Sequence, residues 1–175
     1  MRKKFREYLI VDGYNVINAW EELRETAEKD LEEAREKLNL LLEEYASFRG
    51  LFAIVVYDAY NVRGCAERER RIGNLKIVYT KEKETADTYI EKFITALGPK
   101  RHLSVFVATD DMAEQQITLG KGGNRISTRE LRLEMETVRG KIKEKTRKST
   151  VEKNTLSQHL SRDVLAKLEA IRRQS

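Results

Sequence analysis

The chain has 175 residues and a formal net charge of +5, and its content of 40% apolar and 36% charged residues is that of one soluble domain with its own core. No apolar run approaches the roughly 20 residues that a membrane helix needs, and the basic first residues lead into a strand rather than into a signal-peptide core. The single Cys65 excludes an internal disulfide and a cysteine-rich zinc site, and we expect a cytoplasmic protein with no membrane partner.

Strand and helix patterns alternate along the chain. Continuous apolar runs predict strands at residues 9–11, 51–57, 75–79, 102–108 and 124–126. The spacing of apolar residues predicts helices that begin after Asp12 and that cover 31–49, 85–97, 112–119, 128–148 and 164–171. Residues 59–74 and 150–158 are polar and are predicted to be connections. The alternation predicts an α/β sandwich, in which a mainly parallel sheet of about five strands has helices on both faces and a helical C-terminal extension.

Acidic residues follow three of the predicted strands: Asp12, Asp58 and the pair Asp110-Asp111. Asp12-Gly13 is also a common hairpin turn, but the apolar residues that follow have the spacing of a helix rather than of a second strand. A buried strand that runs into a helix places Asp12 at the carboxyl edge of a parallel sheet, where open α/β folds keep their active sites. We therefore expect these acids to gather at one edge.

A fourth acid reaches this edge from a helix. Asp87 lies three residues before Ile90 and seven before Ile94, on the apolar stripe of the helix predicted over 85–97. A carboxylate in the first turn gains from the helix dipole, which explains an acid at this place but not an acid that faces inward. Because the helix follows the third predicted strand, we expect its first turn to lie at the same edge as Asp12.

Carboxylates that gather at one edge repel one another unless a cation neutralises them. Oxygen ligands without nearby His or Cys suit a hard ion such as Mg²⁺ or Mn²⁺, which activates water and stabilises the charge that develops on a phosphodiester. Asn15 lies three residues beyond Asp12, and its neutral amide can orient the water or a phosphate. The residues therefore indicate metal-assisted phosphodiester hydrolysis.

Structural explanations stay open for two of these acids. Asp111 and Glu114 have the spacing of a capping box, which does not exclude a second role for Asp111, and Asp58 is also a turn residue at a strand end. The glycines at 120–123 lack the spacing of a P-loop. No partners spaced for nucleophilic catalysis accompany the other reactive side chains, Cys65, His102 and His159.

Three motifs resemble, in this order, the NYN domains of the PIN-like nuclease superfamily, and most closely their YacP-like branch. They are Asp12-Gly-Tyr-Asn15, Glu84-Thr-Ala-Asp87, and Ala108-Thr-Asp-Asp111 followed by Glu114-Gln115. The resemblance covers about residues 7–140. It implies a Rossmann-like PIN fold, a three-layer sandwich, and a ribosome-associated endoribonuclease that uses a divalent metal held by aspartates to cleave mRNA within translating ribosomes, near the A site.

Carried over by position, the resemblance makes Asp12, Asp87 and Asp111 metal ligands and Asn15 a further residue of the catalytic site. Asp110 departs from the family pattern, in which a small residue is expected at this position. The additional charge leaves both members of the acidic pair as candidate ligands, and we favour Asp111.

The basic residues are concentrated in the C-terminal part of the chain. Residues 139–175 contain 11 Lys and Arg against 4 Asp and Glu, a net charge of +7, and the remaining residues carry −2. A basic tail indicates a polyanionic partner such as nucleic acid, although a solvated helix surface has the same composition. Together with the resemblance, this predicts a nuclease domain at 1–140 and a basic extension at 141–175. Its cations are expected to follow rRNA phosphates: Lys141, Lys143, Lys145, Arg147 and Lys148.

Two other functions compete with a nuclease. The first is a non-catalytic RNA-binding or ribosome-associated factor with the same fold, but a pure binder has no use for several carboxylates that face a phosphate backbone. The second is a phosphatase of the haloacid dehalogenase type, which also has an aspartate after its first strand. That class needs a second acid two residues later, where this chain has Tyr14.

Overall fold

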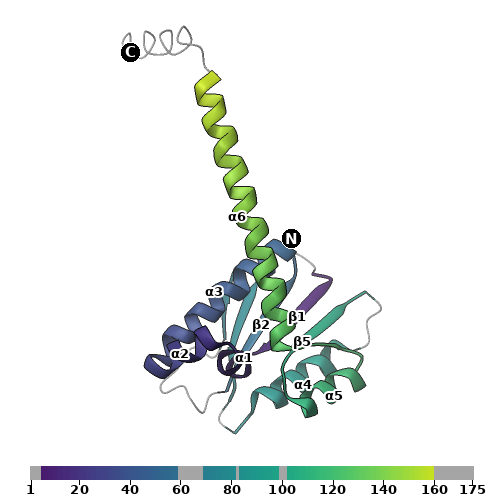
Figure 1. Ribbon diagram of the computed structural model, residues 1–175. Helices are drawn as coiled ribbons and strands as arrows, with labels where there is room; N and C mark the ends of the chain where they lie inside the picture. The colour runs from purple at the N-terminus through teal and green to yellow at the C-terminus, as the bar shows by residue number, and fades with distance from the viewer. Residues whose placement is uncertain (1–4, 59–68, 82, 99–101, 160–175) are drawn as a thin grey trace, which may run out of the picture. The chain divides into compact units, whose positions relative to one another are not determined.

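The computed structural model in Figure 1 describes residues 5–58, 69–81, 83–98 and 102–159. The chain divides after Met135 into two compact units. The first contains the whole sheet and the helices that cover it. Within the described residues, no helix is long and apolar enough to cross a membrane.

The first unit is built around one six-stranded sheet with the order β3-β4-β2-β1-β5-β6. Every neighbouring pair is parallel except β3 and β4, which are antiparallel. The strands are β1 (Glu7–Asp12), β2 (Phe52–Tyr57), β3 (Glu69–Ile72), β4 (Leu75–Tyr79), β5 (Ser104–Ala108) and β6 (Asn124–Ile126). The mainly parallel sheet of the prediction is confirmed, with one strand more than expected.

The additional strand, β3, lies inside the segment that was predicted to be a polar connection, and for these four residues that prediction is wrong. Three of its four residues, Glu69, Arg70 and Arg71, are charged; β3 is an edge strand, where exposed charges are tolerated and protect against further strand pairing. Glu69 pairs with Lys76 on β4 at 2.9 Å, and the Arg71 guanidinium lies 5.0 Å from the ring centroid of Phe52. Of the other residues of the predicted connection, 73–74 form a turn between β3 and β4, and 59–68 lie outside the described residues.

The helices are α1 (Gly13–Ala19), α2 (Glu21–Lys29), α3 (Leu31–Arg49), α4 (Ala86–Leu97), α5 (Met112–Gly120) and α6 (Thr128–His159). Their ends follow the sequence signals. The Thr85 hydroxyl caps α4, and Ser127 and Glu130 form the predicted capping box of α6, with two reciprocal hydrogen bonds of 2.8 and 3.1 Å. Gly50 ends α3 with a φ of 72°, in the left-handed region that favours glycine. The short α2 was not predicted.

The predicted connection at 150–158 is wrong, because α6 continues through it to His159. This stretch is polar but contains neither Gly nor Pro, so nothing in it stops a helix. The helix predicted around 164–171 lies outside the described residues.

The two faces of the sheet are covered by different helices, which gives the three-layer sandwich of the prediction (Figure 1). On one face, Ile10 of β1 and Val56 of β2 pack against Ile90 and Ile94 of α4. On the other face, the Tyr57 hydroxyl donates a hydrogen bond of 2.8 Å to Asn39 Oδ1 of α3. Strand β2 is buried on both faces, as its continuous apolar run predicts.

The order in which strands are added to the sheet reverses at β1. From β1 the chain passes to β2 on one side, and after β4 it returns to place β5 on the other side of β1. Ligand sites of open α/β sheets lie at such a switch point, outside the carboxyl ends of the strands. Asp12 and Asp110-Asp111 follow the two strands that flank this point.

Candidate active site

Four carboxylates come from four different segments at the carboxyl edge of the sheet. Asp12 is the last residue of β1, and Asp58 follows β2. Asp87 lies in the first turn of α4, and Asp111 directly precedes α5. The fold thus brings together residues that are up to 99 positions apart in the sequence, which is the difference between 12 and 111.

The charges of these groups act on one another. The pKa of Asp12 is raised from 3.8 to about 6, first because burial removes water from the carboxylate and then because Asp87 and Asp58 repel its charge. Hydrogen bonds from the backbone N–H groups of Asn15 and Tyr14 oppose this rise. Burial also raises the pKa of Asp87, and the charges of Asp111 and Asp58 add to the effect. The carboxylates therefore form an electrostatic cluster whose ionised state is unfavourable by itself.

Asp12 is held at the junction of β1 and α1. Its Oδ1 accepts a hydrogen bond of 3.1 Å from the backbone N–H of Asn15, so the carboxylate also caps α1. The residue between β1 and the first turn must be glycine, because a Cβ at Gly13 would lie 2.2 Å from Cε1 of the buried Tyr57 ring. The close approach of strand, helix and ring fixes the direction of the Asp12 side chain.

Asp87 is more exposed than its place on the apolar stripe predicted. Its neighbours Ala86, Ile90 and Ile94 are buried, while Asp87 is an exposed residue whose carboxylate is only partly shielded from water. The residue lies at the margin of the stripe, where the helix begins. Its first-turn position agrees with the expectation that α4 begins at the edge that carries Asp12.

The two members of the acidic pair have different partners. Asp110 accepts hydrogen bonds from both the backbone N–H of Thr128, at 2.9 Å, and the Thr128 hydroxyl, which fixes the start of α6. Asp111 Oδ1 accepts from the N–H of Ala113 at 2.7 Å, so Asp111 does cap α5. The side chain of Glu114 lies outside the described residues. Only Asp111 of the pair acts on the charge of Asp87.

Asn15 connects the first motif to the third. Its side-chain oxygen accepts a hydrogen bond of 3.1 Å from the backbone N–H of Asp110, while its own N–H donates to Asp12. Trp20, between α1 and α2, strengthens the same region, because its indole N–H donates to the carbonyl of Thr128 at 3.0 Å. Asn15 is thus placed to hold the two strand ends at a fixed separation.

Two other motif residues have structural partners. Glu84 forms an ion pair of 2.8 Å with Lys92 on α4. Gln115 donates from its side chain to the carbonyl of Thr109 at 2.8 Å, which ties α5 to the end of β5. These contacts give Glu84 and Gln115 structural roles, so their presence in the motifs does not require contact with a ligand.

Sequence reasoning did not single out Arg35, which lies beside the cluster on α3. It is a charged residue on the buried, mainly apolar face of the helix, between Ala34 and Leu38 in the sequence. Only 7% of its surface is exposed, and its Nη1 donates to the Tyr14 hydroxyl at 3.0 Å. The sequence does hold a signal for it: an arginine among the apolar positions of a predicted helix stripe is expected to be buried and to have a specific partner.

The chemistry of the donor set fits a hard divalent cation, because the four groups are carboxylates that repel one another. As the side chains stand, no three acidic, imidazole or thiol groups among the described residues are close enough to bind one ion together. The interactions are pairwise: Asp12 with Asp87 and Asp58, and Asp87 with Asp111 and Asp58.

The cations predicted to bind rRNA belong to the second unit. Lys141, Lys143, Lys145, Arg147 and Lys148 are all exposed on α6. Lys148 pairs with Glu144 one turn earlier at 2.8 Å. The others add positive charge to several faces of one continuous helix.

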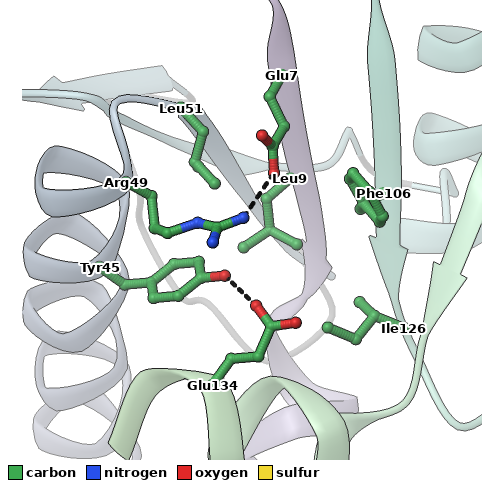
Figure 2. A pocket seen from close by; sticks show the side chains of 8 residues that line it. All are labelled: Glu7, Leu9, Tyr45, Arg49, Leu51, Phe106, Ile126 and Glu134. Carbon is green, nitrogen blue, oxygen red and sulfur yellow. Dashed lines mark hydrogen bonds and ion pairs between the residues drawn. The ribbon is translucent and has the colours of Figure 1, made fainter. Parts of the chain in front are cut away.

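A small pocket lies on the α3 face of the sheet and is separate from the carboxylate cluster. Figure 2 shows its two pairs of charged and polar groups: Arg49 with Glu7 at 3.3 Å, and the Tyr45 hydroxyl with Glu134 at 2.5 Å. The volume is about 40 Å³. Its polar groups satisfy one another, and it is too small for a nucleotide. The lining residues are Glu7, Leu9, Tyr45, Arg49, Leu51, Phe106, Ile126 and Glu134.

Comparisons with known proteins agree with this architecture. The model of the YacP-like NYN domain matches residues 9–173. The chain is 41% identical over 167 residues to Uncharacterized protein YacP of Bacillus subtilis (strain 168), which covers 95% of this chain and 97% of that protein. It is also similar to the crystal structure of Rae1 (YacP) from Bacillus subtilis, with 40% identity and a TM-score of 0.72 over 95% of this chain and 94% of that one. A mutant of Rae1 gives a TM-score of 0.70 at 40% identity, over 82% of each chain.

Proposed function

The chain belongs to the YacP-like NYN domain family, and from this membership we propose that it is a divalent-metal-dependent endoribonuclease that cleaves mRNA in translating ribosomes, near the A site. Membership of the family is consistent with a nuclease or RNA-related function. The finer proposal depends on the cluster of carboxylates and on the basic helix.

One observation carries the nuclease proposal: four carboxylates that repel one another lie at the switch point of an open α/β sheet. In this proposal Asp12, Asp87 and Asp111 hold Mg²⁺ or Mn²⁺, and Asp58 is a further acid of the same cluster. A bound divalent ion supplies activation of water and stabilisation of charge on a phosphodiester. We leave out Asp110, because Thr128 occupies both of its oxygens.

The other residues of the site orient these ligands. The N–H of Asn15 directs the Asp12 carboxylate, and the Asn15 side chain holds the backbone that carries Asp110 and Asp111. Asn15 is thus proposed to be a positioning residue. Substrate contact through its amide, as the sequence suggests, is still possible for the side-chain NH2 group, because the hydrogen bond from Asp110 uses only Oδ1.

The ribosome part of the proposal depends on the exposed cations of α6. Its exposed cations can follow the phosphates of rRNA, and such contacts weaken steeply with salt. The test is ribosome co-sedimentation across a salt series, with Lys141, Lys143 and Lys145 changed to Gln. Weaker binding and a shallower dependence on salt are expected; sedimentation equal to wild type at every salt concentration contradicts this part.

A non-catalytic RNA-binding factor is the second candidate, and the exposed basic helix favours it. The cluster of carboxylates argues against it, because these groups repel the phosphates that a binder must attract.

The decisive experiment is RNA cleavage by wild type and Asp12→Asn, with Mg²⁺, with Mn²⁺ and with EDTA. It is run on free mRNA and on mRNA in translating ribosomes. Asp30→Asn is the matched control, because Asp30 is an exposed acid that caps α3 and lies outside the cluster. Metal-dependent cuts that disappear only with Asp12→Asn support the nuclease. Ribosome binding without cleavage in either setting supports the binding factor.

A further inference from the structure

A buried arginine, Arg35, lies behind Tyr14 at the edge of the carboxylate site. Arg35 is 7% exposed, and among the described residues it forms no ion pair. Its Nε is buried without a hydrogen-bond partner within the same part of the chain. Burial by itself lowers the pKa of Arg35, but the hydrogen bond to Tyr14 and the charge of Glu32 outweigh it, so the guanidinium keeps its charge inside the fold.

The surroundings of Arg35 fix its one strong contact, to Tyr14. The Tyr14 ring packs edge-on against Tyr57, with ring centroids 5.4 Å apart and an interplanar angle of 61°. Tyr57 is held in turn by the side chain of Asn39 and by contact with Gly13. The Tyr14 ring therefore has little freedom to move, and its hydroxyl stays within reach of Arg35.

The hydrogen bond from Arg35 determines what the Tyr14 hydroxyl can do. Because its oxygen accepts from the guanidinium, its own hydrogen must point elsewhere, and no acceptor for it is found among the described residues. Burial raises the pKa of Tyr14, and the hydrogen bond and charge of Arg35 only partly oppose this rise, so the hydroxyl keeps its hydrogen and can donate it. Tyr14 is half-buried, two residues after Asp12, and its hydroxyl is close enough to Asp58 to feel its charge.

We propose that the Tyr14 hydroxyl donates a hydrogen bond to a non-bridging phosphate oxygen of the RNA, and that Arg35 is the positioning residue that orients this hydroxyl. The inference rests on the proposed function and adds to it a contact with the substrate. RNA that approaches the four carboxylates meets a negative field. A hydroxyl donor with a buried cation behind it offers the phosphate a favourable contact at the same edge.

The test measures RNA affinity and cleavage separately. Affinity for a short single-stranded RNA is titrated in EDTA, and cleavage is measured under single-turnover conditions with Mg²⁺. Tyr14→Phe keeps the ring and removes the donor, so we expect about tenfold weaker binding or slower cleavage, the effect of one hydrogen bond to a charged group. Tyr8→Phe is the matched control, a half-buried tyrosine near the start of β1, and is expected to behave like wild type.

Arg35 is tested through Tyr14. Arg35→Lys, which keeps a cationic donor, is expected to retain most of the affinity, and Arg35→Gln to lose as much as Tyr14→Phe. The double variant is expected to be no worse than Tyr14→Phe alone, because the two residues act through one hydroxyl. A purely structural role predicts additive losses that follow the thermal stability of each variant.

The outcomes separate this inference from the nuclease proposal. If wild type cleaves RNA and Tyr14→Phe equals Tyr8→Phe in affinity and rate, the phosphate contact is wrong and the nuclease stands. If wild type binds RNA but cleaves neither free mRNA nor mRNA in translating ribosomes, and Tyr14→Phe binds more weakly, the contact stands and the nuclease does not. Both are overturned if wild type neither binds the short RNA nor cleaves mRNA in translating ribosomes.

Discussion

In metal-free protein, replacement of Asp12 by Asn should stabilise the fold at neutral pH rather than weaken it. Burial and the charges of Asp87 and Asp58 raise the pKa of Asp12 from 3.8 to about 6. The folded protein therefore binds a proton at Asp12 more tightly than the unfolded chain does. The corresponding stability is fully present below pH 3.8 and is lost as the pH rises through about 6.

The size of this loss follows from the two pKa values. One pKa unit corresponds to about 1.4 kcal/mol, so the difference between them amounts to about 3 kcal/mol once Asp12 is ionised in the folded state. Asn has no charge and is as good an N-cap as Asp, so the hydrogen bond from the Asn15 N–H survives. Wild type and Asp12→Asn should thus be similar near pH 4 and differ by up to about 3 kcal/mol at pH 8.

Denaturant unfolding in EDTA at several pH values between 4 and 8 measures this difference. Asp30→Asn is again the control, because Asp30 caps α3 with hydrogen bonds of 2.8 and 3.1 Å but is exposed. Mg²⁺ should then stabilise wild type more than Asp12→Asn, since an ion that binds only the folded state adds stability by mass action. A variant that is less stable than wild type at pH 8, or a difference that does not change with pH, would refute the reasoning.

Three further changes test the frame around the site, each by denaturant unfolding. Gly13→Ala should cost about 3 kcal/mol, because the new Cβ would overlap the buried Tyr57 ring; an unchanged midpoint would mean that the ring moves freely. Trp20→Phe should cost about 1 kcal/mol through loss of the hydrogen bond to Thr128, and a gain in stability would contradict this. Asp110→Ala should cost about 2 kcal/mol but leave the stabilisation by Mg²⁺ equal to that of wild type; a loss of that stabilisation would make Asp110 a metal ligand.

The sheet and its edge were predictable because they depend on local patterns. The apolar runs of β1, β2 and β5 and the glycine at the end of α3 are properties of adjacent residues. The errors arose where a polar composition was interpreted as a connection between elements. Strand β3 was missed because a charged edge strand has the composition of a loop, and the end of α6 was misplaced because a polar stretch without Gly or Pro is compatible with a helix.

The candidate site was predictable at the level of residue types but not of partners. Strand ends placed Asp12 and Asp111 at one edge, whereas the different partners of Asp110 and Asp111 depend on Thr128, which is 18 positions beyond Asp110. The partner of Arg35 could not be predicted from the sequence either. Its contact with Tyr14 joins residues 21 positions apart, and only packing of α3 against the strand end brings them together.

The structural and functional explanations of the acids are compatible with each other. Asp12 caps α1, Asp87 lies in the first turn of α4, and Asp111 caps α5, so three of the four carboxylates face the positive end of a helix. Helix starts can therefore hold mutually repelling acids in place before any cation binds. This has a practical consequence for experiments. Substitution by Asn keeps the caps and removes only the charge, so a loss of cleavage in an Asn variant reports on the site, whereas an Ala variant would also weaken the helix that positions it.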